Sequence, residues 1–551
     1  MPDESDMLQS SIGRNEPAVM SKAAFAVARI GELSKGFILP DRVLKLKDAF
    51  FLNFALLFAY VFLVNREGPY VPSNNEVVYL PYLAKLWNPN FLSNDWTFSG
   101  PLPSHLIFNL LFGPLTLVFP LEVVGWIGRI LSWSLILLAL LQLGKHFRIP
   151  LWMITVSILL WLFYHQSIVG GEWVIGTFEA KGIAYALLFF ALNGFVQQRL
   201  ILPSILLGLA CSFHPLVGLW AALAVALSLL ALRFPINTIF KFGCYTVLFA
   251  LPGLIPLLMT SFEGGSESSE AWKFIALVVI PYHFDPYYFG RSKPLLLLLV
   301  LLLCFNALHL KLCGKSPALQ LLMSLQVFLG FFFILGFLAR FAENYKLLVL
   351  MPCRLFPVLL PLFFFFSLMS ALHQCCSIKA GKSLLVAGFL ALAAFGNPVT
   401  LFIDRVAYHY ELWTRQEEDV QKAFKWIAKN TPPDSIIISP PWRGDSFYHT
   451  RRAQIASWWL PRFDRLTEWR ERLESLGGDV SGVRDGTTKS RVQHMQEHYN
   501  RLTATDIAFL AEKYGAEYLV SSARCSYPVL LNSGTYKVYS LRKGDPAGRE
   551  S

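Results

Sequence analysis

Long apolar runs separated by short polar segments fill the chain between residues 48 and 402. About 20 consecutive apolar residues are enough for a helix to cross the hydrocarbon core of a bilayer. The pattern therefore predicts a mainly α, polytopic helical membrane protein with about 11–13 spans. We place the candidate spans at residues 48–65, 105–119, 122–143, 150–165, 182–196, 201–213, 215–232, 243–260, 294–310, 317–338, 347–371 and 383–402. Because several of them are shorter than a full span, we also expect broken or re-entrant helices.

The composition agrees with a membrane protein and argues against other classes. Hydrophobic residues make up 54% of the chain and charged residues only 15%, whereas soluble domains carry about 25% charged residues. The same numbers exclude a disordered chain. The net charge is +11, but the basic residues lie mostly between apolar runs, where they indicate topology. We therefore expect the lipid bilayer as a partner and no nucleic acid.

The distribution of charge predicts the orientation of the chain. Residues 1–47 are polar, lack the apolar stretch of a signal peptide, and carry five basic residues between positions 29 and 47. The positive-inside rule places this segment in the cytoplasm. If every candidate span crossed, the C-terminal tail would return to the cytoplasm, yet the carboxylate-rich loops indicate that it lies outside. One segment is therefore expected not to cross, and we place it within the pair 105–119 and 122–143.

The composition changes near residue 403, where a charged, Trp-rich tail begins. Phe424 and Ile427 have helical spacing in EEDVQKAFKWIAKNTPPD, and the IIIS that follows predicts a buried strand. TATDIAFLAEKYGAEYLVSS repeats this order, with a start at Thr503 and Asp506 that resembles a capping box. VLLNSGTYKVYSL predicts a closing hairpin. The chain is thus expected to have a cytoplasmic segment 1–47, a transmembrane domain 48–402 with a large first outer loop 66–104, and an extracytoplasmic α/β domain 403–551.

The first outer loop supplies the first candidates for chemistry. Glu76 and Asp95 flank a segment, Glu76–Leu86, that could form an amphipathic helix on the membrane surface. A carboxylate that acts as a base could sit here, although loop carboxylates are most often simply solvated.

A second set of candidates lies at the edges of apolar spans, where ionisable groups are costly and tend to mark functional sites. Glu172, Glu179 and Lys181 follow a Gly-Gly pair that would let a ligand approach the backbone. An arginine inside an apolar run, Arg354, must be paired or face a polar cavity, and a lipid phosphate is a natural partner. Two histidines join this set, although such histidines are more often structural. We predict one polar cavity at the outer leaflet, lined by Glu76, Asp95, Glu172, Glu179, His214, His283 and Arg354.

Several familiar motifs are missing from the sequence. There is no Walker A motif, no GxGxxG in a βαβ setting, no HExxH and no GxSxG. The eight cysteines show no CxxC or Cys/His spacing, so we expect neither a disulfide nor a structural metal site.

Five short motifs together resemble the GT-C superfamily of membrane glycosyltransferases. More closely, they resemble a bacterial group of polytopic membrane proteins with that architecture. The motifs are YLPYLAKLWNPNFLSNDW after the first span, GGEW with FEAKGIAYAL, CSFHPLVGLW, HFDPYYF and MPCRLFPVLLP, and a tail beginning FKWIAKNTPPDSIIISPPW also fits. The resemblance implies a multi-pass protein of the bacterial inner (cytoplasmic) membrane.

The resemblance also implies an activity. In the superfamily an acidic residue of the first outer loop is the catalytic base or a metal-binding carboxylate, which leaves Glu76 or Asp95 for this role and a divalent metal ion as a candidate cofactor. The donor is commonly a polyprenyl-phosphate sugar, and Arg354 would bind its phosphate, with Glu172, Glu179, Lys181, His214 and His283 as further substrate-binding residues. The chain departs from the family pattern in lacking a tight acidic pair after the first span.

Two other functional classes share these features. A transporter or flippase of a lipid-linked or anionic solute would also have broken spans and intramembrane charges. A non-catalytic partner subunit that kept the fold would explain the missing acidic pair. We favour an enzyme because the first outer loop is large and the tail is a single α/β unit.

Overall fold

The computed structural model describes residues 46–64, 68, 70–99, 105–164, 166–263, 267–290, 293–312, 316–375, 398–414, 416–483 and 487–542. The chain divides into two units, Met1–Asn53 and Phe54–Ser551. All contacts discussed below lie within the second unit. The segment 1–45, on which the predicted cytoplasmic orientation depends, and most of the candidate span 383–402 lie outside the described residues.

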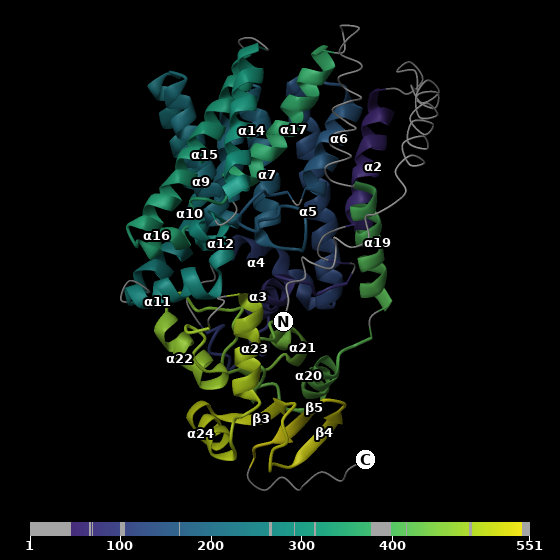
Figure 1. The fold of residues 1–551 in the computed structure, drawn as a ribbon, viewed down its shortest axis with the longest axis vertical. Coiled ribbons are helices and arrows are strands. Elements are labelled where there is room, and N and C mark those ends of the chain that lie inside the picture. Colours follow the sequence, from purple (N-terminus) through teal and green to yellow (C-terminus); the bar gives the residue numbers. More distant parts are fainter. Residues whose placement is uncertain are drawn as a thin grey trace, which may run out of the picture. The chain divides into compact units, whose positions relative to one another are not determined.

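Helices make up most of the described chain before residue 415 (Figure 1). In chain order they are α2 (Leu46–Val64), α3 (Glu76–Trp87), α4 (Leu106–Phe112), η1 (Gly113–Leu117), α5 (Leu121–Gly144), η2 (Lys145–Phe147), α6 (Leu151–Phe163), α7 (Ala180–Val196), α8 (Ile201–Phe213), α9 (Pro215–Ala231), α10 (Ile236–Glu263), α11 (Ser269–Phe274), η4 (Ile275–Val279), α12 (Pro281–Phe284), α13 (Pro286–Gly290), α14 (Lys293–Leu312), α15 (Pro317–Phe341), α16 (Tyr345–Val349), α17 (Phe356–Cys375) and α19 (Pro398–Thr414).

Four of these helices are long and apolar enough to cross a membrane: Leu121–Phe147, Ile236–Met259, Pro317–Phe341 and Phe356–Gln374. Seven further apolar helices in the described part of the chain are shorter. The expectation of a mainly α membrane protein with several short helices is therefore confirmed. Of the pair expected to contain the non-crossing segment, 105–119 is among the shorter helices, because α4 ends at Phe112 and continues only as the 3₁₀ turn η1, whereas 122–143 lies in one of the four long helices.

The prediction of one continuous span over residues 347–371 is wrong. Helix α16 ends at Val349 and α17 begins at Phe356. Met351 adopts a left-handed backbone with φ 52° in the connecting segment, and Pro352 has no N–H to continue a helix. Arg354 consequently lies in this non-helical break and not within a span. In the break its side chain contacts polar groups from other segments.

Small residues let the helices pack closely. A Cβ atom added at Gly128 of α5 would lie 2.1 Å from the ring of Phe178, which precedes α7. One added at Gly218 of α9 would lie 2.2 Å from the backbone of Cys211 in α8. The first of these contacts positions the segment before α7, which carries Glu172 and Glu179 of the candidate site.

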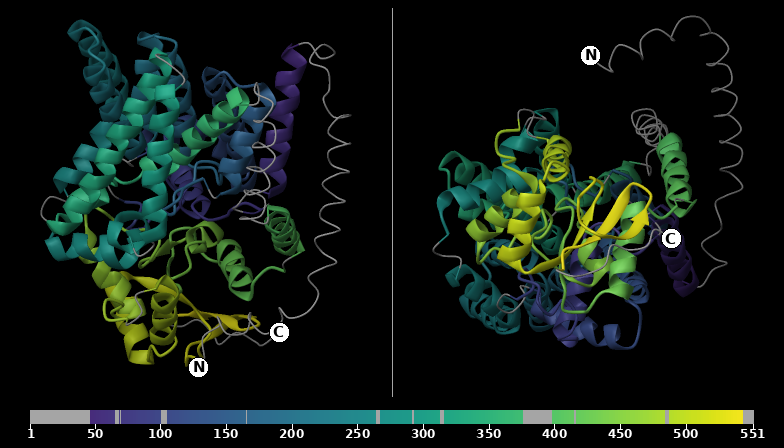
Figure 2. Two further views of the ribbon diagram at one scale, coloured as in Figure 1. Left: turned by 45° about the horizontal axis from the view of Figure 1, so that its top comes forward. Right: turned by 90° about the horizontal axis from the view of Figure 1, so that it is seen from below.

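The tail forms a five-stranded sheet with the order β2-β1-β3-β5-β4 (Figures 1 and 2). Its strands are β1 (Ile436–Ile438), β2 (Ala453–Gln454), β3 (Ala516–Ser521), β4 (Val529–Ser533) and β5 (Tyr536–Ser540). Its helices are α20 (Asp419–Asn430), α21 (Ser446–Thr450), α22 (Leu466–Gly477), α23 (Thr488–Tyr499) and α24 (Ala504–Tyr514). Strands β2, β1 and β3 pair in parallel, whereas β3, β5 and β4 pair antiparallel. The predicted α/β order, the closing hairpin and the capping box between Thr503 and Asp506 are all confirmed.

The two faces of the sheet have different neighbours, because successive side chains of a strand point to opposite faces. Ile437 packs in one apolar cluster with Phe424 and Ile427 of α20. Ile438 belongs to a second cluster that also contains Trp469 of α22. That second cluster includes residues 274–276 and 279, which belong to α11 and η4 before the tail. The tail therefore shares a hydrophobic core with the helical part of the chain.

Candidate functional site

Glu76 begins α3 and is completely buried, as is Arg129 of α5. The guanidinium holds the carboxylate through two hydrogen bonds of 2.7 Å, from Nε to Oε1 and from Nη2 to Oε2. The backbone N–H groups of Ser73 and Phe178 donate to the same two oxygens at 2.9 and 2.8 Å. Glu76 thus accepts four hydrogen bonds from three separate segments. This arrangement fastens the first outer loop to α5 and to the segment before α7.

Asp95 lies at the other end of the first outer loop and contacts the tail. Its Oδ1 accepts hydrogen bonds from the N–H groups of Thr97 and Phe98, and its Oδ2 accepts one of 2.8 Å from the N–H of Gln454 in β2. Burial raises the pKa of the Asp95 carboxyl to about 6, although these three hydrogen bonds and Lys85 oppose the shift. Asp95 therefore joins the loop to the sheet.

A buried cluster of charged side chains lies around Arg354. Its Nη2 is 2.9 Å from Oε2 of Glu172, which belongs to the segment between α6 and α7. Lys181, in the first turn of α7, lies 3.5 Å from Oε1 of the same carboxylate. All three side chains are at most 8% exposed. A buried carboxylate is thus shared by two cations, one before α17 and one at the start of α7.

Glu179 completes this cluster on the side of α3. It lies 3.4 Å from Nζ of Lys181 and accepts hydrogen bonds from Asn75, Trp173 and Thr177. The ammonium of Lys181 lies over the indole of Trp173, 3.6 Å from the ring centroid. Glu179 is therefore held by neutral donors as well as by a cation.

Spare bonding capacity distinguishes the Glu172–Arg354 pair from these neighbours. Among the described residues, Nε of Arg354 has no hydrogen-bond partner, and Oε2 of Glu172 accepts no hydrogen bond of regular geometry. Buried polar atoms are ordinarily paired. A ligand with both donor and acceptor groups would satisfy them.

Three histidines and Tyr79 lie around Arg354, together with the buried Tyr185 of α7, which also interacts electrostatically with Arg354. His283 of α12 contacts the carbonyl oxygen of Gly170 through Nδ1 at 2.9 Å. The ring of His214, at the junction of α8 and α9, stacks on His105 with 5.1 Å between centroids. The hydroxyl of Tyr79 in α3 lies 3.2 Å from Nε2 of His105. Each of these four side chains interacts electrostatically with Arg354.

The site is open near its glycine pair. Gly170 and Gly171 have left-handed backbones, with φ of 81° and 61°. A Cβ added at Gly170 would meet no atom within 4 Å, and Gly171 is exposed. Ligand access from this side would bring a group beside His283 and Glu172.

The structure brings six of the eight predicted site residues together: Glu172, Glu179, Lys181, His214, His283 and Arg354. Glu76 adjoins this cluster through Phe178, which precedes Glu179. Asp95 instead lies against the tail. The predicted assignment of the catalytic base to Glu76 or Asp95 stays a prediction.

Sequence reasoning missed Arg129, Tyr79 and His105. A signal existed for Arg129, which interrupts an apolar run as Arg354 does. Nothing in the sequence marks Tyr79 or His105, because each is one polar residue among many in the first outer loop or at its end.

The candidate divalent metal finds little support in this arrangement. Among the residues that the structure describes, no group of three or more His, Cys, Asp or Glu side chains could hold a metal ion. The carboxylates of the cluster are instead paired with Arg354 and Lys181.

Comparison with protein-family models and with curated proteins gave no match. Two solved structures with similarity are from Archaeoglobus fulgidus. One is an oligosaccharyltransferase in complex with zinc and sulfate, with TM-score 0.42 and 14% identity over 86% of this chain and 67% of that chain. The other is the archaeal oligosaccharyltransferase AglB in complex with an inhibitory peptide and a dolichol-phosphate, with TM-score 0.41 and 13% identity over 86% of this chain and 69% of that chain.

Proposed function

We propose that this protein is a membrane glycosyltransferase of the GT-C type, which moves a sugar from a polyprenyl-phosphate-linked donor to an acceptor at the outer membrane face. One observation carries the proposal. The segments GGEW with FEAKG, FHP, HFDP and MPCR are far apart in sequence, and their charged and polar side chains converge on Arg354. These are the segments on which the resemblance to membrane glycosyltransferases rests.

In this proposal Arg354 and Lys181 bind the phosphate of the donor. A planar guanidinium suits the paired oxygens of a phosphate, and an ammonium adds a second charge. Both cations now contact Glu172. A phosphate that takes over these contacts would leave the Glu172 carboxylate free to accept a proton.

The transfer step then follows from these positions. Glu172 takes the proton of the acceptor hydroxyl, whose oxygen forms a bond to the anomeric carbon. The bond between that carbon and the phosphate oxygen breaks, and the electron pair stays on the phosphate. Arg354 and Lys181 stabilise the charge that develops there.

We place the base at Glu172 rather than at Glu76 or Asp95 for a physical reason. Glu76 accepts four hydrogen bonds and Asp95 accepts three. A base needs a free lone pair directed at the acceptor, and Oε2 of Glu172 accepts no regular hydrogen bond among the described residues, although it lies 2.9 Å from Nη2 of Arg354. Glu76 and Asp95 are then positioning residues.

We further propose a multi-pass protein of the bacterial inner membrane, with the N-terminus in the cytoplasm and the domain 403–551 outside. The support is the segregation of basic and acidic loops. Cysteines introduced at Ser10 and Asn430, which is exposed, test this orientation. An impermeant thiol reagent added to intact cells should label position 430 only, and equal labelling would contradict the proposal.

The activity is tested with purified protein and a panel of radiolabelled polyprenyl-phosphate sugars. The wild type should transfer one of them, and Glu172→Gln should reduce the rate by about 100-fold or more, because general-base catalysis contributes about that much. Glu270→Gln is the matched control, because Glu270 is 72% exposed. Full transfer by Glu172→Gln would contradict the assignment of the base.

The same panel separates the other classes. A transporter or flippase would move a lipid-linked sugar between the leaflets of a vesicle without forming product. A non-catalytic partner subunit would bind the lipid, or another protein, and form no product with any sugar. Either result would overturn the proposed enzyme.

A further inference from the structure

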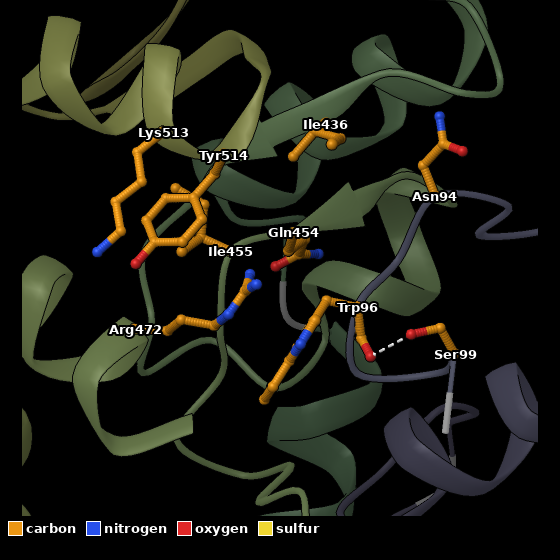
Figure 3. A pocket seen from close by; sticks show the side chains of 9 residues that line it. All are labelled: Asn94, Trp96, Ser99, Ile436, Gln454, Ile455, Arg472, Lys513 and Tyr514. Carbon is orange, nitrogen blue, oxygen red and sulfur yellow. Dashed lines mark hydrogen bonds between the residues drawn. The ribbon is translucent and has the colours of Figure 1, made fainter. Parts of the chain in front are cut away.

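A pocket lies where the first outer loop meets the tail, at residues that the proposed transfer reaction does not use (Figure 3). Its volume is about 310 Å³, which falls at the lower end of the range for small-molecule sites. Trp96 comes from the loop, whereas Gln454, Ile455, Arg472 and Tyr514 come from the tail. The pocket is therefore large enough for one small ligand that touches both parts.

The pocket is rich in hydrogen-bond donors. Gln454 is 2% exposed, and its Nε2 has no partner among the described residues. Its Oε1 lies 2.6 and 2.7 Å from the hydroxyls of Ser439 and Ser446, so one polar atom of the amide stays unpaired in either orientation. The indole N–H of Trp96 is also buried without a partner in the described chain. Neutral N–H groups of this kind suit hydroxyl or carbonyl oxygens of a ligand.

Two cations add a positive field to these donors. The guanidinium of Arg472 lies between two rings, 4.2 Å from the centroid of Trp96 and 4.7 Å from that of Tyr514. Nε and Nη2 of Arg472 donate hydrogen bonds of 3.0 and 2.8 Å to the carboxylate of Glu468. The ammonium of Lys513 lies 5.1 Å from the centroid of Tyr514. The residues that line the pocket include no carboxylate, so the lining favours an anion.

The remaining surface is apolar. Ile436 and Ile455 line the pocket together with the aromatic ring of Tyr514. A sugar ring combines an apolar C–H face with hydroxyl groups at its edge. Such a ring fits a site that offers both an apolar wall and neutral N–H donors. A simple inorganic anion would leave the apolar wall and the neutral donors unused.

We propose that this pocket binds an acidic saccharide, a sugar that carries a carboxylate or a phosphate. The anionic group interacts with Lys513 and Arg472, and the ring packs against Tyr514 and Ile455. Hydroxyl oxygens accept hydrogen bonds from Gln454 and Trp96. This site is independent of the proposed transfer reaction, because it uses none of the residues around Arg354.

Calorimetric titration of the full chain in lipid nanodiscs tests the proposal. Glucuronate and glucose 6-phosphate are the acidic probes and distinguish the two sources of charge. Glucose, inorganic phosphate and an acidic dipeptide are the comparison probes. At least one acidic sugar should bind saturably and about 10-fold more tightly than glucose or phosphate alone, the equivalent of one charge-assisted hydrogen bond.

Substitutions test whether the acidic sugar binds in this pocket. Lys513→Gln should weaken it about 3-fold, because Lys513 is exposed and its charge is partly screened. Lys489→Gln on α23 is the matched control, because Lys489 is an exposed lysine of the same tail, and it should leave binding unchanged.

Four outcomes would overturn the proposal: no saturable binding of either acidic sugar, equal binding of inorganic phosphate, tighter binding of the dipeptide, or equal effects of the two lysine variants. Because the readout is binding alone, failure of sugar transfer would not affect it. Transfer that proceeds normally would not rescue it either.

Discussion

Two buried Glu–Arg pairs stand close together in this protein, and they are built differently. In the Glu76–Arg129 pair the carboxylate takes two hydrogen bonds from the guanidinium and two from backbone N–H groups. In the Glu172–Arg354 pair the guanidinium nitrogen Nε has no partner among the described residues, and one carboxylate oxygen accepts no regular hydrogen bond. The same two residue types therefore form one pair whose carboxylate oxygens are both hydrogen-bonded and one pair that keeps unpaired polar atoms. We call Glu76–Arg129 the closed pair and Glu172–Arg354 the open pair.

The difference separates an ion pair whose hydrogen bonding is complete within the described chain from one that leaves polar atoms unpaired. Burying two charges costs free energy, which only good geometry and further hydrogen bonds offset. The first pair meets this condition within the chain. The second pair keeps unpaired polar atoms beside an exposed glycine, an arrangement that a bound ligand would complete.

The largest effect is expected from breaking the closed pair. Arg129→Met leaves the Glu76 carboxylate buried without its cation, and removing one partner of such a pair costs about 3–5 kcal/mol. We expect little folded protein, or a strongly lowered midpoint of thermal unfolding. Lys273→Met removes an exposed ion pair and should cost less than about 1 kcal/mol. Equal midpoints for the two variants would contradict the comparison.

Asp95 is intermediate between Glu76 and Glu172, because it is buried with three N–H partners and has no ion-pair partner among the described residues. Its pKa of about 6 exceeds the unfolded value of 3.8, so folding favours the protonated carboxyl. Its stabilising contribution to the free energy of unfolding is complete below about pH 4 and is lost as the pH rises through 6. The total loss is about 3 kcal/mol.

Thermal unfolding of the wild type and of Asp95→Asn between pH 4 and 7 measures this contribution. The variant cannot titrate at this position, so the wild type should lose more stability than the variant over that range. Parallel curves for the two proteins would show that Asp95 does not titrate differently in the folded state.

The open pair should respond to a ligand where the closed pair does not. A polyprenyl-phosphate at 100 times its dissociation constant should stabilise the wild type by about 2.7 kcal/mol. Arg354→Gln should lose most of this stabilisation, because it removes the guanidinium proposed to bind the phosphate. Thermal unfolding with and without the lipid gives the measurement, and equal stabilisation of both proteins would place the phosphate elsewhere.

The smallest effect is expected at the exposed edge of the loop. The amide of Asn94 donates a 2.7 Å hydrogen bond to the carbonyl oxygen of Asp434 in the tail. Asn94→Ala should cost about 0.5–1.5 kcal/mol, the net contribution of one ordinary hydrogen bond. Asn90→Ala, exposed in the same loop, is the control and should change the midpoint little. A larger effect at Asn90 would contradict the described contact.

Local patterns in the sequence predicted much of the fold. The capped helix from Ala504 to Tyr514 and the hairpin after it follow from short-range rules, and both are present. The break around Arg354 was missed, because an apolar run with three prolines can continue as a helix or stop. Apolarity alone does not distinguish these outcomes.

The site was predictable only in part, because its residues are far apart in the sequence. The cost of burying a charge marked Arg354 and Glu172 as unusual. Their partners could not be assigned, because Glu172 and Arg354 are 182 positions apart. Glu76 illustrates the limit, since its charge marked it as a candidate, whereas its partners, Arg129 and two backbone N–H groups, could not be assigned from the sequence.

The contact between Asp95 and Gln454 also sets an order of events during synthesis. The two residues are 359 positions apart, and a chain that grows by 5–20 residues per second needs about 20 to 70 s to make the second after the first. The loop therefore waits, with one oxygen of its buried carboxylate unfilled, until the tail emerges. A chain that ends within this interval lacks Gln454, so Oδ2 of Asp95 in the first outer loop has no partner in the tail.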